Sequence, residues 1–121
     1  MKFQTPKVLY QSLFDNTPDG LAYCQMLFDA QGRATDFIYV AVNKNFGRLM
    51  GLKEVIGKRA TDLTPGIIAS SPTLFEIYGR ISLSGEPERF EVYIESLSKW
   101  FFVSAYSPKK KFFVSIFQDI T

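Results

Sequence analysis

Residues 88–119 read ERFEVYIESLSKWFFVSAYSPKKKFFVSIFQD, and this stretch of the chain decides the fold. Aromatic and β-branched residues, which favour strands, dominate three runs at residues 88–95, 99–107 and 111–119. The connections between the runs are short and built from turn formers, Ser96-Leu97-Ser98 and Pro108-Lys109-Lys110. Short connections join antiparallel neighbours, so the stretch predicts three consecutive strands of one antiparallel sheet.

The faces of these strands are not equally polar. Over residues 90–95, phenylalanine, valine and isoleucine alternate with glutamate, tyrosine and glutamate, as expected of a strand with one face in water. In the other two runs both alternating sets are largely apolar. We therefore predict that helices cover one face of the sheet centre. The other face also needs a cover, either an N-terminal helix at residues 5–14 or a second copy of the chain.

Upstream of residue 88, turn formers divide the chain into shorter elements. Apolar residues at positions 74, 77, 78 and 81 follow the spacing of a helix, and the capping-box sequence Thr73-Leu74-Phe75-Glu76 predicts its start. Further helices are predicted at residues 5–14, opened by Thr5-Pro6, at 44–50, capped by Asn43, and at 53–56, with strands at 21–28 and 37–42. This order predicts an α+β fold, a five-stranded antiparallel sheet with helices packed on one face and an N-terminal helix.

The composition bounds the class of protein. The chain has 121 residues, of which 46% are hydrophobic and 16% aromatic, enough for one domain with one core and too few for a two-domain enzyme. A net charge of +2 and a single basic run in a predicted turn, at residues 109–111, give no footprint for nucleic acid. No apolar run is long enough to insert into a membrane, and the lone Cys24 fits a reducing compartment. We therefore expect a cytoplasmic protein.

Residue types for catalysis or metal binding are scarce. The sequence has no histidine and one cysteine, which leaves no zinc ligand set and no histidine base for a serine nucleophile. Residues 51–58 look like a phosphate-binding loop, but five residues instead of four separate the glycines, and Arg59 stands where Ser or Thr would bind magnesium. Cys24 lies among apolar residues and is expected to fill the core. We expect no catalytic residue, no metal site and no enzymatic activity.

Four segments in this order and spacing together resemble the PAS domain family. They are Asp19-Gly20-Leu21-Ala22-Tyr23, Val42-Asn43-Lys44-Asn45-Phe46, Val55-Ile56-Gly57-Lys58 and Phe117-Gln118-Asp119-Ile120-Thr121. The resemblance is best to PAS domains that precede histidine kinase or GGDEF diguanylate cyclase output domains in bacterial signalling proteins. It implies a single sensor domain over residues 1–121, with a cap helix at 1–16 and a core at 17–121. It also implies a sensory or dimerisation module, a homodimer, that relays its state to a C-terminal output domain.

The resemblance also bears on cofactors. Flavin-binding light sensors of this family carry a reactive cysteine a few residues after the glycine that corresponds to Gly57, and residues 58–61 contain none. Haem-binding members usually supply an axial histidine, which the chain lacks. These departures imply neither haem nor a flavin adduct, and leave an unidentified small apolar ligand as the expected occupant of an interior cavity. The alternative is that the aromatic side chains fill this space themselves.

Correspondence with the family also orients the last two strands, and predicts that residues 113, 115 and 117, with residues 102, 104 and 106, face the helices. The expected ligand pocket consists of Cys24, Met26, Phe28, Phe46, Ile77, Tyr78, Phe90, Val92, Phe102, Ser104, Ser115 and Phe117. The expected dimer face consists of Phe101, Val103, Phe112, Val114 and Ile116. Signal relay is assigned to Asp119, Ile120 and Thr121, where an output domain would follow. The rival function is a small cone-shaped α+β enzyme or carrier that encloses an apolar ligand.

Overall fold

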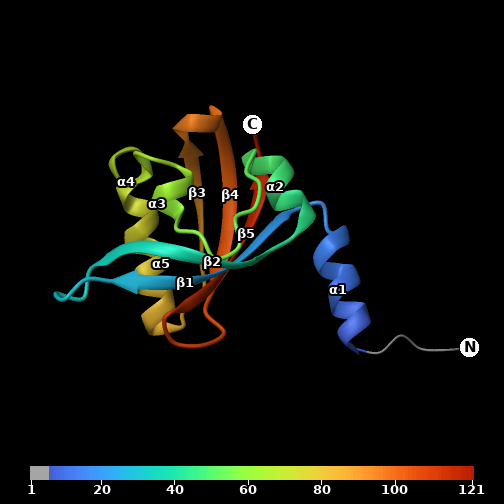
Figure 1. Cartoon of the computed structure of the whole chain (residues 1–121), viewed down its shortest axis with the longest axis horizontal. Helices are drawn as coiled ribbons and strands as arrows, with labels where there is room; N and C mark the ends of the chain where they lie inside the picture. The colour runs from blue at the N-terminus through green and yellow to red at the C-terminus, as the bar shows by residue number, and fades with distance from the viewer. Residues whose placement is uncertain (1–5) are drawn as a thin grey trace, which may run out of the picture.

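The computed structural model describes residues 6–121, which form one five-stranded antiparallel sheet with helices (Figure 1). Across the sheet the strands follow the order β2-β1-β5-β4-β3. In chain order they are β1 (Gly20–Phe28), β2 (Ala34–Val42), β3 (Glu88–Ile94), β4 (Lys99–Tyr106) and β5 (Phe112–Asp119). The two strands before the helices and the three after them therefore meet through the pair β1–β5, and the predicted fold class is confirmed.

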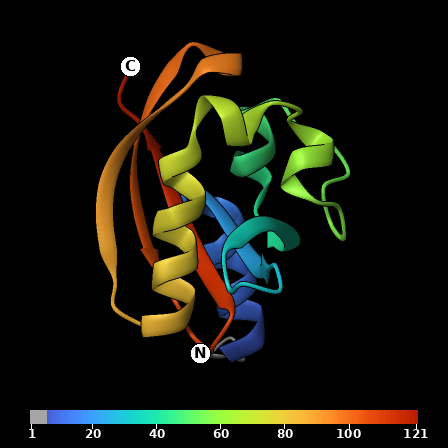
Figure 2. The same cartoon turned by 90° about the vertical axis from the view of Figure 1, so that its left-hand side faces the viewer.

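The helices between β2 and β3 lie on one face of the sheet, as Figure 2 shows. They are α2 (Lys44–Met50), α3 (Ala60–Leu63), α4 (Ile67–Ser70) and α5 (Pro72–Ser84). The helix α5 runs along the sheet and contacts every strand, while a short 3-10 helix η1 (Glu95–Leu97) joins β3 to β4. No helix within residues 6–121 is long and apolar enough to cross a membrane.

The N-terminal helix α1 (Pro6–Asn16) packs on α2 and stands off the sheet (Figure 1). Its side chains Leu9 and Leu13 remain exposed. The helix therefore does not cover the outer face of the sheet, the face that is turned away from α2–α5. Its predicted N-cap, Thr5, lies outside the described residues.

The predicted orientation of β5 is correct, and that of β4 is wrong by one residue. Phe113, Ser115 and Phe117 are buried beneath the helices. On β4 the inward residues are Phe101, Val103 and Ala105, since Val103 pairs with Phe117 and Ala105 with Ser115. The residues predicted to face inward, Phe102, Ser104 and Tyr106, lie on the outer face instead. Both alternating sets of β4 are largely apolar, so periodicity alone could not choose between them.

Two predictions for the helical segment are also wrong. The helix α5 begins at Pro72 instead of at Thr73, and its cap Ser71 makes no side-chain capping bond. Proline at the first helical position supplies a helical φ and has no N–H that needs a cap, which explains why the capping-box sequence is not used. Residues 53–56 are not helical, because Glu54 has a left-handed φ of 53° and the Lys58 N–H bonds back to the Val55 carbonyl in a turn.

Asn43 connects α2 to the start of β1. The predicted cap is confirmed, because its Oδ1 accepts the N–H of Phe46 at 2.9 Å. The same oxygen accepts the N–H of Leu21 at 2.9 Å, and Nδ2 donates to the Asp19 carbonyl at 2.9 Å. The Asn43 side chain is buried, so these three bonds replace the water it has lost and hold one wall of the helical layer against the sheet.

Asp36 makes the matching connection on β2. Its buried carboxylate accepts the N–H and the hydroxyl of Thr61, in the first turn of α3. The segment after α2 also pairs with the edge of β2, where the Tyr39 N–H bonds to the Lys58 carbonyl and the Gly57 N–H to the Tyr39 carbonyl. The backbone that carries Tyr39 is therefore bonded on the side away from β1 as well.

Candidate ligand-binding cavity

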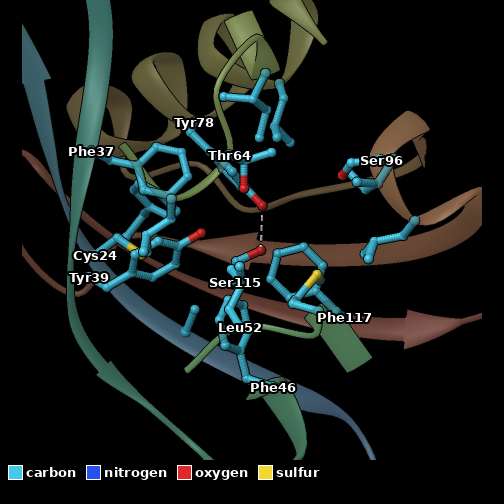
Figure 3. Close-up of a pocket in the computed structure, with 18 of the residues that line it drawn as sticks. Cys24, Phe37, Tyr39, Phe46, Leu52, Thr64, Tyr78, Ser96, Ser115 and Phe117 are labelled. Carbon is cyan, nitrogen blue, oxygen red and sulfur yellow. Dashed lines mark hydrogen bonds between the residues drawn. The ribbon is translucent and has the colours of Figure 1, made fainter. Parts of the chain in front are cut away.

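A cavity of about 310 Å³ lies between the sheet and the helices (Figure 3). Strands β1, β2 and β5 form its floor, and α2, α5 and the α3–α4 connection form its walls. Ser96 and Leu97 of η1 line one end. The largest side chains around it are aromatic: Phe37, Tyr39, Phe46, Tyr78, Phe113 and Phe117. The aromatic interior therefore leaves space unfilled, although Tyr78 and Phe113 stack at a ring-centroid distance of 4.2 Å.

The residues expected to form the pocket fall into three groups. Those that line the cavity are Cys24, Phe46, Tyr78, Ser115 and Phe117. Those that belong to the core or pack against it without lining the cavity are Met26, Phe28, Ile77, Phe90 and Val92. Phe102 and Ser104 were also expected in the pocket. This prediction is wrong, because the alternate residues of β4 face the helices and these two lie on the outer face.

Sequence analysis did not identify Tyr39 and Phe37 of β2 or the loop residues Thr64 and Ser96 as lining residues. The β2 run from Phe37 to Val42 is apolar at every position, so no polar alternation indicated which face of it points inward. Thr64 and Ser96 lie in connections whose course depends on the whole fold. The only polar side-chain group in this run is the Tyr39 hydroxyl.

Tyr78 and Ser115 form a buried hydrogen bond across the cavity. Their hydroxyl oxygens are 2.7 Å apart, with either able to donate, and Figure 3 shows the bond between α5 and β5. Complete burial raises the pKa of Tyr78 well above its ordinary value, and the bond from Ser115 only partly opposes this. Tyr78 is therefore neutral at physiological pH, and the two hydroxyls largely satisfy each other.

The Tyr39 hydroxyl points into the same space without a partner. Tyr39 is 7% exposed, and none of the hydrogen bonds found within residues 6–121 involves its hydroxyl. Figure 3 shows the oxygen directed towards the interior of the cavity. Burial, with smaller effects of Cys24 and Asp36, raises the pKa of Tyr39, so this phenol keeps its proton.

The lining of the cavity is polar in places and charged nowhere. No aspartate, glutamate, lysine or arginine is among its described lining residues. Burial raises the pKa of the Cys24 thiol well above its ordinary value, so the thiol is protonated and is not a nucleophile. The cavity therefore combines apolar walls with neutral hydroxyl and thiol groups, which suits binding better than acid–base chemistry.

The expected relay residues are anchored on β4. The Trp100 N–H donates to Thr121 Oγ1 at 2.9 Å, and the Ile120 N–H donates to the Trp100 carbonyl at 3.0 Å. Asp119 Oδ1 accepts the Thr121 N–H at 2.9 Å, which with Lys99 lowers the pKa of this carboxyl. The Ile120 side chain is 43% exposed, so this residue is held through its backbone N–H and not through its side chain.

The outer face retains only part of the expected dimer surface. Phe112, Val114 and Ile116 of β5 lie on it, partly exposed. Phe101 and Val103 are fully buried on the opposite face, so their assignment to the dimer surface is wrong. Phe102 and the exposed pair Tyr93–Trp100, whose ring centroids are 5.3 Å apart, take their place on β3 and β4.

Comparison with solved structures identifies the fold. The Rhodobacter sphaeroides LOV protein matches 97% of this chain and 69% of its own, with TM-score 0.58 and 17% identity. A domain of an HTR-like protein from Haloarcula marismortui matches 87% and 100%, with TM-score 0.59 and 17% identity. A PAS domain from Colwellia psychrerythraea matches 94% and 98%, with TM-score 0.56 and 19% identity. No protein-family model and no curated protein matches the sequence. The chain therefore has the PAS fold.

Proposed function

We propose that this chain is a sensory domain that binds a small ligand in its cavity and relays occupancy to a C-terminal output domain, without catalysis of its own. The observation that carries the proposal is the position of η1. Ser96 and Leu97 line the cavity, and three residues beyond Leu97 the backbone of Trp100 bonds to Ile120 and Thr121. A ligand that contacts η1 thus acts on the segment that leads out of the sheet through one short hairpin.

The output domain in this proposal is a histidine kinase or a diguanylate cyclase in the cytoplasm. Support comes from the sequence resemblance and from a structural match to a photoactive yellow protein domain of a sensor histidine kinase from Rhodospirillum centenum, at 16% identity and TM-score 0.52. The rival function, a cone-shaped enzyme or carrier, would use the same apolar cavity. Acid–base catalysis most often uses a histidine or a carboxylate, and no described lining residue is either, while burial keeps Tyr39, Tyr78 and Cys24 protonated.

The relay is tested by Asp119→Ala. The substitution removes the acceptor of the Thr121 N–H and the partner of Lys99, whose Nζ lies 3.7 Å from the carboxylate. We expect faster amide hydrogen exchange at Thr121, an unchanged fold, and loss of stimulus dependence in the protein that joins this domain to its output domain. Asp62→Ala, on the exposed surface of α3, is the control. Stimulus dependence that is retained in a folded Asp119→Ala protein would contradict the proposed relay.

We also propose that the domain is a homodimer that associates through the outer face. Val114 lies at the centre of this face, opposite Tyr23 on β1 and Tyr106 on β4. Since α1 leaves the face uncovered, a second copy is the cover that completes it. The patch is apolar at its centre, and the charged residues Arg89 and Glu91 of β3 lie towards its edge, as in an interface with a polar rim.

Val114→Lys should convert this dimer to a monomer in sedimentation velocity, because it buries an unpaired charge at the centre of the interface. Ile68→Lys introduces the same charge at an exposed apolar residue of α4, on the helical side of the sheet, and should leave the dimer intact. A monomeric wild-type protein at high concentration, or equal effects of both substitutions, would contradict the proposed interface.

The proposed module uses neither haem nor flavin. No cationic side chain among the described lining residues is placed to pair with the phosphate of a flavin nucleotide. The sequence has no histidine to ligate haem and no cysteine at residues 58–61. The cavity and its residues therefore do not fit these two groups, and we expect the purified domain to be colourless.

A further inference from the structure

We infer that the ligand of this cavity is an uncharged, compact molecule whose apolar body packs among the aromatic rings and whose hydrogen-bond acceptor takes the proton of the Tyr39 hydroxyl. This inference rests on the proposed sensory function and names the chemical class of its ligand. The volume sets the size: about 310 Å³ lies at the small end of the range of roughly 300–1,000 Å³ that ligand pockets span, which suits a compact molecule.

The lining residues determine whether the ligand can carry a charge. An ion that enters this cavity loses its water, and no described lining residue carries an opposite charge to replace it. A buried ion without a partner is strongly disfavoured, so carboxylates, phosphates and ammonium groups are excluded from the enclosed part of the site. Aromatic and aliphatic walls favour an apolar body instead.

Tyr39 sets the position of the polar atom. Tyr78 and Ser115 already bond to each other at 2.7 Å, whereas the Tyr39 hydroxyl is aimed into the space and has no hydrogen-bond partner within residues 6–121. No fully buried polar side-chain atom within residues 6–121 lacks a hydrogen-bond partner, so the Tyr39 oxygen is open to the cavity, where an acceptor on a ligand can take its proton. Backbone bonds to Gly57 and Lys58 hold the Tyr39 backbone from the edge of β2 that is away from β1, so the strand position that carries the donor is fixed before binding.

The test uses acetophenone, an uncharged aromatic ketone of suitable size, as the probe. Benzoate has nearly the same shape with a charge, and ethylbenzene lacks the acceptor. Titrations followed by backbone NMR shifts should show acetophenone binding at the cavity and benzoate binding at least tenfold more weakly. Tyr39→Phe keeps the ring and removes the hydroxyl, so it should weaken acetophenone binding about two- to tenfold and leave ethylbenzene binding unchanged.

Ala22→Leu locates the binding. Ala22 lies on the cavity floor opposite Ser115, and the larger side chain should abolish binding of both acetophenone and ethylbenzene, with Ala22→Val as a milder filling variant if Ala22→Leu fails to fold. Benzoate binding as tight as acetophenone binding, an unchanged acetophenone affinity in Tyr39→Phe, or no binding of acetophenone to the wild type overturns the inferred ligand class. Those results leave the sensory function standing, since Asp119→Ala tests the relay independently of these probes.

Discussion

Asn43→Ala should lower the free energy of unfolding by about 3 kcal/mol in urea denaturation at neutral pH. The substitution removes the cap of α2 and leaves the Leu21 N–H and the Asp19 carbonyl without their partner. Each lost bond contributes about 1 kcal/mol, and the total is a large part of the roughly 5–15 kcal/mol that stabilises a domain of this kind.

Asn16→Ala is the matched control for Asn43→Ala. Its side chain donates a single exposed bond to the Ser12 carbonyl at the end of α1, so we expect less than about 1 kcal/mol of destabilisation. If Asn43→Ala and Asn16→Ala cost the same, Asn43 does not join α2 to β1 in the way described here.

Phe101→Ala should cost about 3–5 kcal/mol, and Phe102→Ala clearly less. Phe101 is fully buried and meets the Phe117 ring edge-on at a centroid distance of 6.0 Å, so its removal leaves a cavity in the core. Phe102 lies on the outer face and stays partly exposed, so its removal leaves little void. The two residues are identical and adjacent, which makes each the control for the other.

Comparing Phe101→Ala with Phe102→Ala shows which of the two alternating sets of β4 residues faces the helices. Sequence analysis predicted that Phe102 faces the helices, which would give the opposite ranking of the two substitutions. Unfolding measured at low protein concentration, where the proposed dimer is dissociated, separates core packing from association. A larger loss for Phe102→Ala than for Phe101→Ala would show that the sequence prediction was right and that the β4 register described here is wrong.

The architecture could be predicted because its signals are local. Glycines and prolines separate the elements, the Asn43 cap lies three residues before Phe46, and strand propensity over residues 88–119 is strong. Which residues of β4 face the helices could not be predicted, because both alternating sets, one with Phe101 and one with Phe102, are largely apolar. Pairing with β5 decides between them. A shift of one residue in a strand exchanges the two faces, so this single error displaced four of the expected site and interface residues.

The cavity itself depends on contacts that are distant in sequence. Ser115 was among the residues expected to form the pocket, but its bond to Tyr78 joins positions 37 residues apart. Tyr39 escaped attention because its strand is apolar on both sides, and η1 was expected only as a tight turn. Residue types therefore indicated an aromatic interior. The empty volume, and the Tyr39 hydroxyl that points into it, could be identified only from the folded structure.

Native mass spectrometry of the protein purified from its own cells tests most directly the claim that this cavity holds a small ligand. We expect the wild-type domain to carry one small uncharged molecule and folded Ala22→Leu, whose added side chain occupies the cavity floor, to carry none. A wild-type spectrum that shows only the mass of the bare chain, or a ligand that persists in Ala22→Leu, would contradict it.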